Sequence, residues 1–273
     1  MGVGLLFDAS LEEFLEREGD APGALWFFLH IPKTAGSSFR SELARSLRPS
    51  SNLTVDYKQG EGTLAAQRAV VLDRFVDEML HNEKPYRFAS GHVQHPSVER
   101  IAAAYPKTRI VTMLRDPVKR LVSEYRYQLT DLNPLNARFR ERFPSFDAYA
   151  RDESSQNKMH KFLATREDEP VPDVVARMAD TYSFVGLQEM YALSFRLMSL
   201  LLGRAAEAPT VHTRKTPSTS DNELDSDALP VRTLRELNAL DQAIFDHFRR
   251  LFVERRETIQ EAMRAVSRQR LRA

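Results

Sequence analysis

The chain has 273 residues, with 39 basic and 38 acidic side chains and a formal net charge of +1. A general nucleic-acid binder draws its affinity from an excess of basic surface, so this balance argues against that class. The absence of cysteine excludes disulfides and cysteine-ligated metal sites. The length suits a single α/β domain over residues 1–273 with a sizeable core.

The N-terminal residues lack the basic flank and apolar core of a signal peptide. No apolar run approaches the roughly 20 residues that a membrane-spanning helix needs. We therefore expect a cytoplasmic protein without a transmembrane segment. The oligomeric state cannot be predicted from these features.

Helical and strand patterns alternate along the first half of the chain. Ser10 caps a short helix that ends at Glu18, with Glu13 completing a capping box. An apolar run at 24–29 predicts the first strand, and a helix follows from Ser37 to about Leu47. The next predicted elements are a strand at 53–57, a helix at 63–80, a strand at 86–90, a helix at 97–104 and a strand at 109–114.

The second half begins with a helix from Pro117 to about Leu129, because Asp116 is a good N-cap and proline suits the first helical turn. Several short helices and no strands are expected across 131–180, which we interpret as a helical cap. The remaining predictions are a strand at 182–186, a helix at 189–202, a short strand at 210–212, a loop at 214–230, and one long or two abutting helices across 231–267.

This alternation predicts an α/β fold, a P-loop-like and mainly parallel sheet flanked by helices, with the helical cap as an insertion. Ligands of such sheets bind beyond the carboxyl ends of the strands. Lys33, His92 and Arg115 all lie at predicted strand ends. One crevice can therefore hold all three side chains.

The segment after the first strand has the composition of an anion site. A short loop with Gly36, Ser37 and Ser38 leads directly into a helix. Backbone N–H groups at a helix N-terminus point toward a bound phosphate, and the helix dipole favours its charge. Lys33 adds a mobile positive charge, and the hydroxyl of Thr34 adds a donor. The G-x-x-x-x-G-K-S/T spacing of nucleoside triphosphatases is absent.

The motif H-I-P-K-T-A-G-S-S-F at 30–39 resembles the 5′-phosphosulfate loop of sulfotransferases that use 3′-phosphoadenylyl sulfate (PAPS). The residues of this motif are most similar to those of the family that contains heparan sulfate 2-O-sulfotransferase and its bacterial relatives. A second motif, R-I-V-T-M-L-R-D-P-V-K-R-L-V-S-E-Y-R-Y at 109–127, resembles the 3′-phosphate motif of the same family. Outside the two motifs the similarity is diffuse. The resemblance implies a bacterial enzyme.

The resemblance implies that Lys33 stabilises the leaving phosphate, a kind of interaction worth about 3 kcal/mol in comparable sites. It also implies that Arg115 and Ser123 hold the 3′-phosphate, and a structural ion pair of Arg115 with Asp116 or Glu124 is the alternative. The donor would be PAPS, the product adenosine 3′,5′-bisphosphate (PAP), and no metal would be needed. The donor-binding residues implied are Lys33, Thr34, Ala35, Gly36, Ser37, Ser38, Arg115 and Ser123.

For the general base, the resemblance points to His92 in the segment F-A-S-G-H-V at 88–93. The 2-O-sulfotransferase branch has a His-Gly-His-Val step there, and Ser90 replaces the first histidine. A histidine has a pKa of about 6.5, which suits a general base. A purely structural histidine is the alternative. His92 and His95 have no clustered carboxylates or cysteines to complete a metal site.

Weaker signals come from Asn157 and Lys161, in a segment resembling one near the acceptor or the 3′-phosphate, and from Arg214 and Lys215 in a family loop that closes over the nucleotide. An amphipathic helix and a charged surface loop explain these equally well. The leading interpretation is transfer of a sulfuryl group to an acceptor hydroxyl, expected on a carbohydrate or glycolipid. A P-loop kinase or triphosphatase, and an inactive nucleotide-binding scaffold, are the alternatives. Three arginines of the cap are expected on a solvated helix face, with contact to an anionic glycan as the alternative: Arg138, Arg140 and Arg142.

Overall fold

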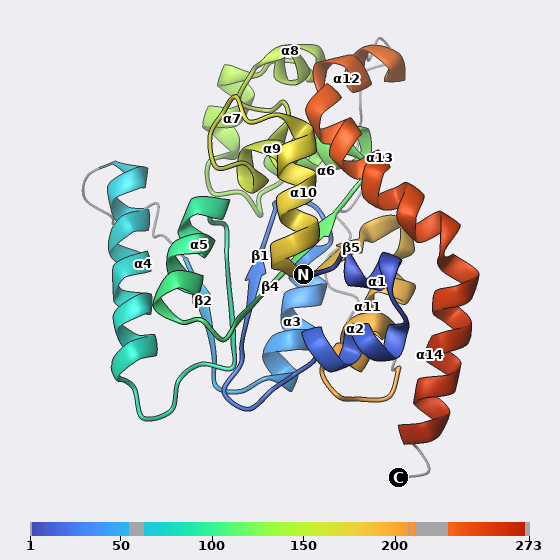
Figure 1. The fold of residues 1–273 in the computed structure, drawn as a ribbon. Helices are drawn as coiled ribbons and strands as arrows, with labels where there is room; N and C mark the ends of the chain where they lie inside the picture. The colour runs from blue at the N-terminus through green and yellow to red at the C-terminus, as the bar shows by residue number, and fades with distance from the viewer. Residues whose placement is uncertain (1, 55–62, 207, 211–228, 271–273) are drawn as a thin grey trace.

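A computed structural model describes residues 2–54, 63–206, 208–210 and 229–270. Its centre is one sheet with the strand order β2-β3-β1-β4-β5, in which all four pairings are parallel (Figure 1). The predicted α/β class and parallel sheet are therefore confirmed. The strands are β1 (Leu25–Leu29), β2 (Ser50–Leu53), β3 (Phe88–Gly91), β4 (Thr108–Leu114) and β5 (Tyr182–Leu187).

Helices flank this sheet, and the short helices of the cap gather at one end of the molecule (Figure 1). Before β5 the helices are α1 (Leu5–Asp8), α2 (Leu11–Glu18), α3 (Gly36–Ser46), α4 (Leu64–His81), α5 (His95–Ala104), α6 (Pro117–Gln128), α7 (Asn136–Arg142), α8 (Phe146–Arg151), α9 (Lys158–Leu163) and α10 (Val171–Thr181). After it come the 3-10 turn η1 (Gln188–Met190), α11 (Tyr191–Leu201), α12 (Val231–Leu237), α13 (Ala239–Glu254) and α14 (Arg256–Arg270).

β1 is the middle strand of the sheet, and all five of its side chains are fully buried, as expected for a strand covered on both faces. Phe28 of β1 packs edge-to-face on Phe39 of α3, with the ring centroids 5.2 Å apart. Such aromatic pairs contribute about 0.5–1.5 kcal/mol beyond area burial. The contact fixes α3 against the strand that precedes it, so the loop between them has two rigid ends.

Two predicted strands differ from the structure. The strand expected at 53–57 is wrong in position, because β2 spans Ser50–Leu53 and Thr54 lies outside it. β2 pairs only with β3 and is mostly exposed, so its residues are polar and their pattern predicts a loop. Thr210 lies in no strand, and its N–H donates to Glu42 at 2.6 Å. The rest of the expected strand at 210–212 lies outside the described residues, as do 55–57.

The C-terminal segment forms three helices where one or two were expected, so that prediction is wrong. The break between α12 and α13 lies at Asn238, which is fully buried. Its side-chain amide donates to the Leu234 carbonyl at 2.9 Å, and its side-chain carbonyl accepts from the N–H of Asn157 at 3.0 Å. This hydrogen bond to a distant part of the chain stabilises the non-helical backbone at Asn238. The break between α13 and α14 lies at Arg255.

The predicted helical cap contains α7 to α10, and a buried ion pair joins it to α6. The fully buried Arg120 pairs with Glu124 one turn along α6. Arg120 also donates to the Ser155 carbonyl at 3.1 Å, and Lys158 pairs with Glu124 at 3.3 Å. These charges compensate one another, which a buried charge requires. The network holds the cap over one end of α6.

Candidate active site

The carboxyl ends of β1 and β4 meet where the strand order changes direction, since β1 leads to strands on one side and β4 to β5 on the other. Ligands of parallel sheets bind outside such a switch point. One guanidinium nitrogen of Arg115 (Nη1), just after β4, donates to the carbonyl oxygen of Lys33, just after β1, at 2.9 Å. The two predicted phosphate motifs are therefore in direct contact.

The loop between β1 and α3 has an uncommon backbone conformation. Lys33 and Ala35 have φ values of 69° and 65°, in the left-handed region that side chains other than glycine rarely adopt. Such residues cost about 1–3 kcal/mol each, and they cluster at functional sites. Ala35 is left-handed directly before the right-handed start of α3. This sequence of conformations turns successive N–H groups into an anion-binding concavity.

The hydroxyls of this loop differ in their surroundings. Thr34 is fully buried, and its hydroxyl donates to the Ile31 carbonyl at 3.0 Å. Its proton therefore stabilises the loop in this structure. Ser37 is exposed and Ser38 half-buried in the first turn of α3, where no side chain caps the helix N-terminus. The first-turn N–H groups of α3, together with these two serines, are well placed for an anion.

Gly36 begins α3 because no larger residue fits there. A Cβ atom at this position would lie 2.1 Å from Cδ2 and Nε2 of the His30 ring. The phosphate loop and His30 are thus packed as closely as the chain allows.

Arg115 is half-buried, and its Nε atom has no hydrogen-bond partner in the described part of the chain. Burial lowers the pKa of its guanidinium, and the nearby Glu189 acts in the opposite direction. The alternative ion pair is not found: within the described residues Arg115 lies in no salt bridge, whereas Glu124 is held by Arg120 and Lys158. An anion beside Nε would satisfy the donor and offset the desolvation.

Asp116 has a structural role at the start of α6. Its carboxylate accepts from the N–H of Lys119 at 2.9 Å, and its own N–H donates to Glu189 at 3.2 Å. Ser123 is half-buried, one turn beyond Lys119 on the same face of α6. One turn further along α6, the ring of Tyr127 meets the first motif, with the Lys33 ammonium 4.2 Å from the ring centroid. This cation–π contact holds the lysine beside α6.

His92 lies next to His30 because β3 and β1 pair in register, with Leu29 opposite Gly91. Its Nδ1 is 2.6 Å from the His30 carbonyl, so Nδ1 carries the proton and Nε2 keeps its lone pair. The two rings are 4.3 Å apart. Burial lowers the pKa of His92, although its side chain remains exposed on one side, and the His30 carbonyl acts in the opposite direction. Burial, with the charge of His92, lowers the pKa of His30 well below its usual value.

Three further residues considered in the sequence analysis, His95, Asn157 and Lys161, form hydrogen bonds within the fold. His95 is buried, with Nδ1 2.9 Å from the Tyr182 hydroxyl. The side-chain oxygen of Asn157 accepts from the N–H groups of Leu240 and Asp241. The Lys161 ammonium donates to the Glu153 carbonyl. The segment 212–216, with Arg214 and Lys215, lies outside the described residues.

Sequence reasoning missed His30, Tyr127 and Glu189. His30 had a usable signal, because the residue after one parallel strand lies beside the residue after the neighbouring strand. Tyr127 and Glu189 reach the site through tertiary packing of α6 and η1, which no local pattern shows.

Within the described ranges, no three histidine or acidic side chains are grouped as a metal site. Among the helices of the same ranges, none is both long and apolar enough to cross a membrane.

No curated protein matches this chain. The solved structures that resemble it distantly include two sulfotransferases. Mouse sulfotransferase SULT7A1, solved as a complex with PAP, is 15% identical with a TM-score of 0.39, and the match covers 71% of this chain and 64% of that one. A sulfotransferase from Alicyclobacillus acidocaldarius is 17% identical with a TM-score of 0.41, covering 84% and 94%.

The family model described as "Sulfotransferase family" matches residues 25–248, which include both phosphate motifs, His92 and the cap. The match covers most of the 273 residues. The chain belongs to the sulfotransferase family.

Proposed function

We propose that this protein transfers the sulfuryl group of PAPS to an acceptor hydroxyl. The observation that carries the proposal is the hydrogen bond from Arg115 to the Lys33 carbonyl. It joins the motif expected to hold the 5′-phosphosulfate to the motif expected to hold the 3′-phosphate, so one bisphosphorylated nucleotide can contact both.

The loop and α3 supply the donor-binding groups of this proposal. The N–H groups of Ala35 to Ser38 and the serine hydroxyls bind the 5′-phosphate, while the Nε donor of Arg115, with Ser123, binds the 3′-phosphate. In direct in-line transfer, the acceptor oxygen forms a bond to sulfur as the bond from sulfur to the 5′-phosphate oxygen breaks. The electron pair stays on that phosphate oxygen, where the charge of Lys33 stabilises it.

His92 is the general base of the proposal. Its Nε2 is directed away from the His30 carbonyl and has the lone pair needed to accept the acceptor proton. His30 is a positioning residue, because its carbonyl selects the tautomer of His92 and its ring packs against it.

The proposal also includes the chemical class of the acceptor. We infer a hydroxyl of a carbohydrate or glycolipid, from the resemblance of both motifs and of the segment at 88–93 to the 2-O-sulfotransferase branch. A cytoplasmic location and a bacterial origin stay predictions.

Binding calorimetry with PAP and AMP tests the donor assignment. Wild type should bind PAP much more tightly than AMP, since only PAP has a 3′-phosphate. Arg115→Ala should weaken PAP binding by about 10- to 100-fold, the cost of a charge-assisted hydrogen bond, and AMP binding far less. Arg138→Ala, an exposed arginine of the cap, is the matched control. Equal weakening of both nucleotides by Arg115→Ala would show that the 3′-phosphate lies elsewhere.

Sulfuryl transfer itself is measured with radiolabelled PAPS and a panel of glycans and glycolipids. Label should appear in an acceptor with wild type and disappear with Lys33→Ala. PAP binding without transfer to any acceptor would favour the inactive scaffold.

A further inference from the structure

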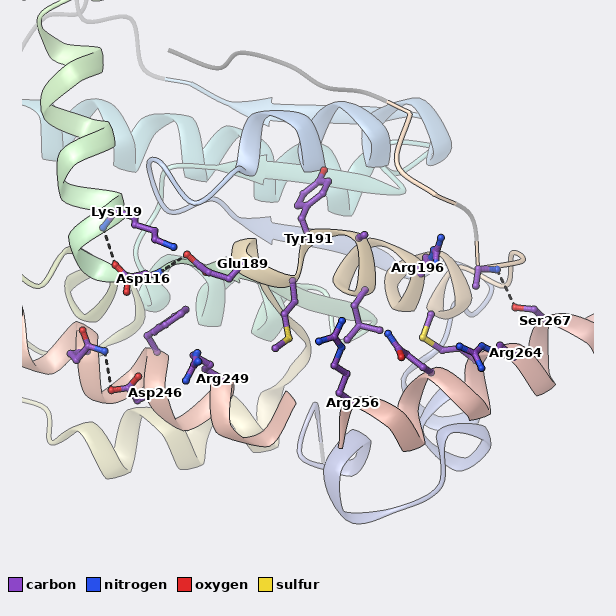
Figure 2. Close-up of a pocket in the computed structure, with 18 of the residues that line it drawn as sticks. Asp116, Lys119, Glu189, Tyr191, Arg196, Asp246, Arg249, Arg256, Arg264 and Ser267 are labelled. Atoms are coloured by element: carbon purple, nitrogen blue, oxygen red, sulfur yellow. Dashed lines mark hydrogen bonds between the residues drawn. The ribbon is translucent and has the colours of Figure 1, made fainter. Parts of the chain in front are cut away.

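A large groove lies on the side of the molecule away from His92. It has a volume of about 1100 Å³, at the upper end for ligand sites. Its walls are η1 and α11 on one side and α13 and α14 on the other, and it begins at the first turn of α6 (Figure 2). His92 follows β3, two strands away from β4 in the sheet, so the groove and the proposed base lie on opposite sides of β1.

The groove collects positive charge in a chain whose formal net charge is only +1. Three acidic side chains also line it, and all three form hydrogen bonds: Asp116 accepts from the N–H of Lys119, Glu189 from the N–H of Asp116, and Asp246 from Gln242 at 2.9 Å. The basic residues come from both walls, and none of them forms a salt bridge within the described part of the chain. They are Lys119, Arg196, Arg235, Arg249, Arg256, Arg264 and Arg268.

Basic side chains without a salt bridge also occur elsewhere in the described residues, but here seven of them line one groove. Several arginines elsewhere pair with carboxylates on the same helix or across elements, as Arg100 does with Asp73. In Figure 2, Arg196 extends from α11, Arg249 from α13, and Arg256 and Arg264 from α14, spaced along the gap between these helices. Positive charges gathered without counter-charges repel one another, and a bound anion removes that cost.

The chemistry of the lining indicates the ligand. Arginine has a planar fork of donors that matches the oxygens of phosphate or sulfate. Between the arginines lie apolar side chains, including Phe245 and Met263. The side-chain oxygen of the lining residue Gln242 is buried and has no hydrogen-bond partner among the described residues. These features suit an extended ligand with a carbon framework and several anionic groups.

We propose that this groove is a second anion site, which binds a ligand carrying at least two phosphate or sulfate groups while the nucleotide site is occupied. The proposal does not depend on the sulfuryl-transfer reaction, because it rests on the charges and shape of the groove. The groove begins beside the nucleotide site, because Asp116 and Lys119 line it, and it extends away from Arg115, which does not line it, along α13 and α14.

Calorimetric titration of the full chain with sodium tripolyphosphate, with and without saturating PAP, tests the proposal. Wild type should bind tripolyphosphate in both cases with similar affinity. Arg264→Ala on one wall and Arg196→Ala on the other should each weaken binding about tenfold, with unchanged melting temperatures. Arg264→Lys should have an intermediate effect, since it keeps the charge and loses the fork. Arg138→Ala, which removes an equally exposed charge from α7, should leave binding unchanged.

A second titration, with a polysulfated disaccharide, tells phosphate from sulfate as the preferred group, and tighter binding of either one supports the proposal. Three results would overturn it: no binding by wild type, loss of tripolyphosphate binding when PAP is present, or equal weakening by Arg138→Ala. If PAP fails to bind at all, the proposed function is wrong, while the titration without PAP still decides whether the groove binds anions.

Discussion

At the scale of single residues, the candidate site depends on two contacts of His92, one with the backbone carbonyl of His30 and one with its ring. The carbonyl fixes the proton of His92 on Nδ1, and the neighbouring ring limits access of water to the imidazole. Desolvation disfavours the charged form of a histidine, so the lowered pKa keeps His92 neutral at pH 7. A neutral imidazole with a free Nε2 is the form that accepts a proton.

His92→Ala should reduce turnover about 10²- to 10⁴-fold, the usual contribution of a general base. PAP affinity and melting temperature should stay near wild type, because the side chain is exposed. In wild type the rate should fall as the pH drops below the lowered pKa of His92, and this acidic limb should be absent from the variant. His95→Ala is the control, since that buried residue should cost stability and spare the limb. Nearly full activity of His92→Ala would place the base elsewhere.

His30→Ala keeps the carbonyl and removes only the ring. Water then reaches His92 more easily, so the pKa of His92 should rise toward about 6.5 and the acidic limb of the rate should move to higher pH. The measurement is the pH dependence of kcat for both proteins. A purely structural role for the His30 ring predicts lower stability with the limb at its wild-type position.

At the scale of elements, sequence patterns predicted the buried strands, and they missed the strand and helix boundaries that long-range contacts set. β1 is apolar throughout because both faces of the sheet cover it, and its position was confirmed. β2 is an edge strand whose polar Ser50, Ser51 and Asn52 carry no such pattern. The end of α12 depends on a bond from Asn157, far away in the sequence, so no local signal marks Asn238 as a break.

The same distinction holds for the site. The motifs predicted which strand ends carry Lys33, His92 and Arg115, because a parallel sheet places its loops on one edge. The ring packing of His30 against Gly36 and the cation–π contact at Tyr127 depend on how β1, α3 and α6 dock. The packing of these elements on one another depends on residues throughout the core, and a short motif contains few of them.

The cap depends on one carboxylate of α13. Asp241 is fully buried and accepts from the N–H groups of Met159 and His160 at 3.0 and 2.7 Å, which caps α9. Asp241→Ala leaves both donors unsatisfied, at about 1–3 kcal/mol each. We expect unfolding in urea at a clearly lower midpoint, with Glu254→Ala, an exposed residue of the same helix, near wild type. A midpoint shift no larger than that of Glu254→Ala would contradict the capping role.

At the scale of the whole molecule, buried carboxylates link stability to pH. Burial alone would raise the pKa of Glu169, but hydrogen bonds from Arg177 and Thr165 outweigh it and lower the pKa from 4.5 to about 2. A carboxylate with a lowered pKa stabilises the fold above its unfolded value, and this contribution is lost as the pH falls.

Glu169→Gln should therefore be less stable than wild type at pH 7, and the difference should shrink between pH 4.5 and about 2. Thermal unfolding across this pH range measures it. Asp168→Asn, a neighbouring exposed carboxylate, should give a curve parallel to wild type. A constant difference between Glu169→Gln and wild type would mean that the effect is not one of charge.

The contact of Gly36 with the His30 ring makes the two positions genetically interdependent. Any side chain at position 36 collides with that ring, so the cost of a substitution there depends on which residue stands at position 30. Gly36→Ala should be poorly tolerated alone and better tolerated with His30→Ala, a positive epistasis in folding. The double variant would still lack the ring beside His92. Change at position 36 is thus constrained by the His30 ring, which packs against the proposed base His92.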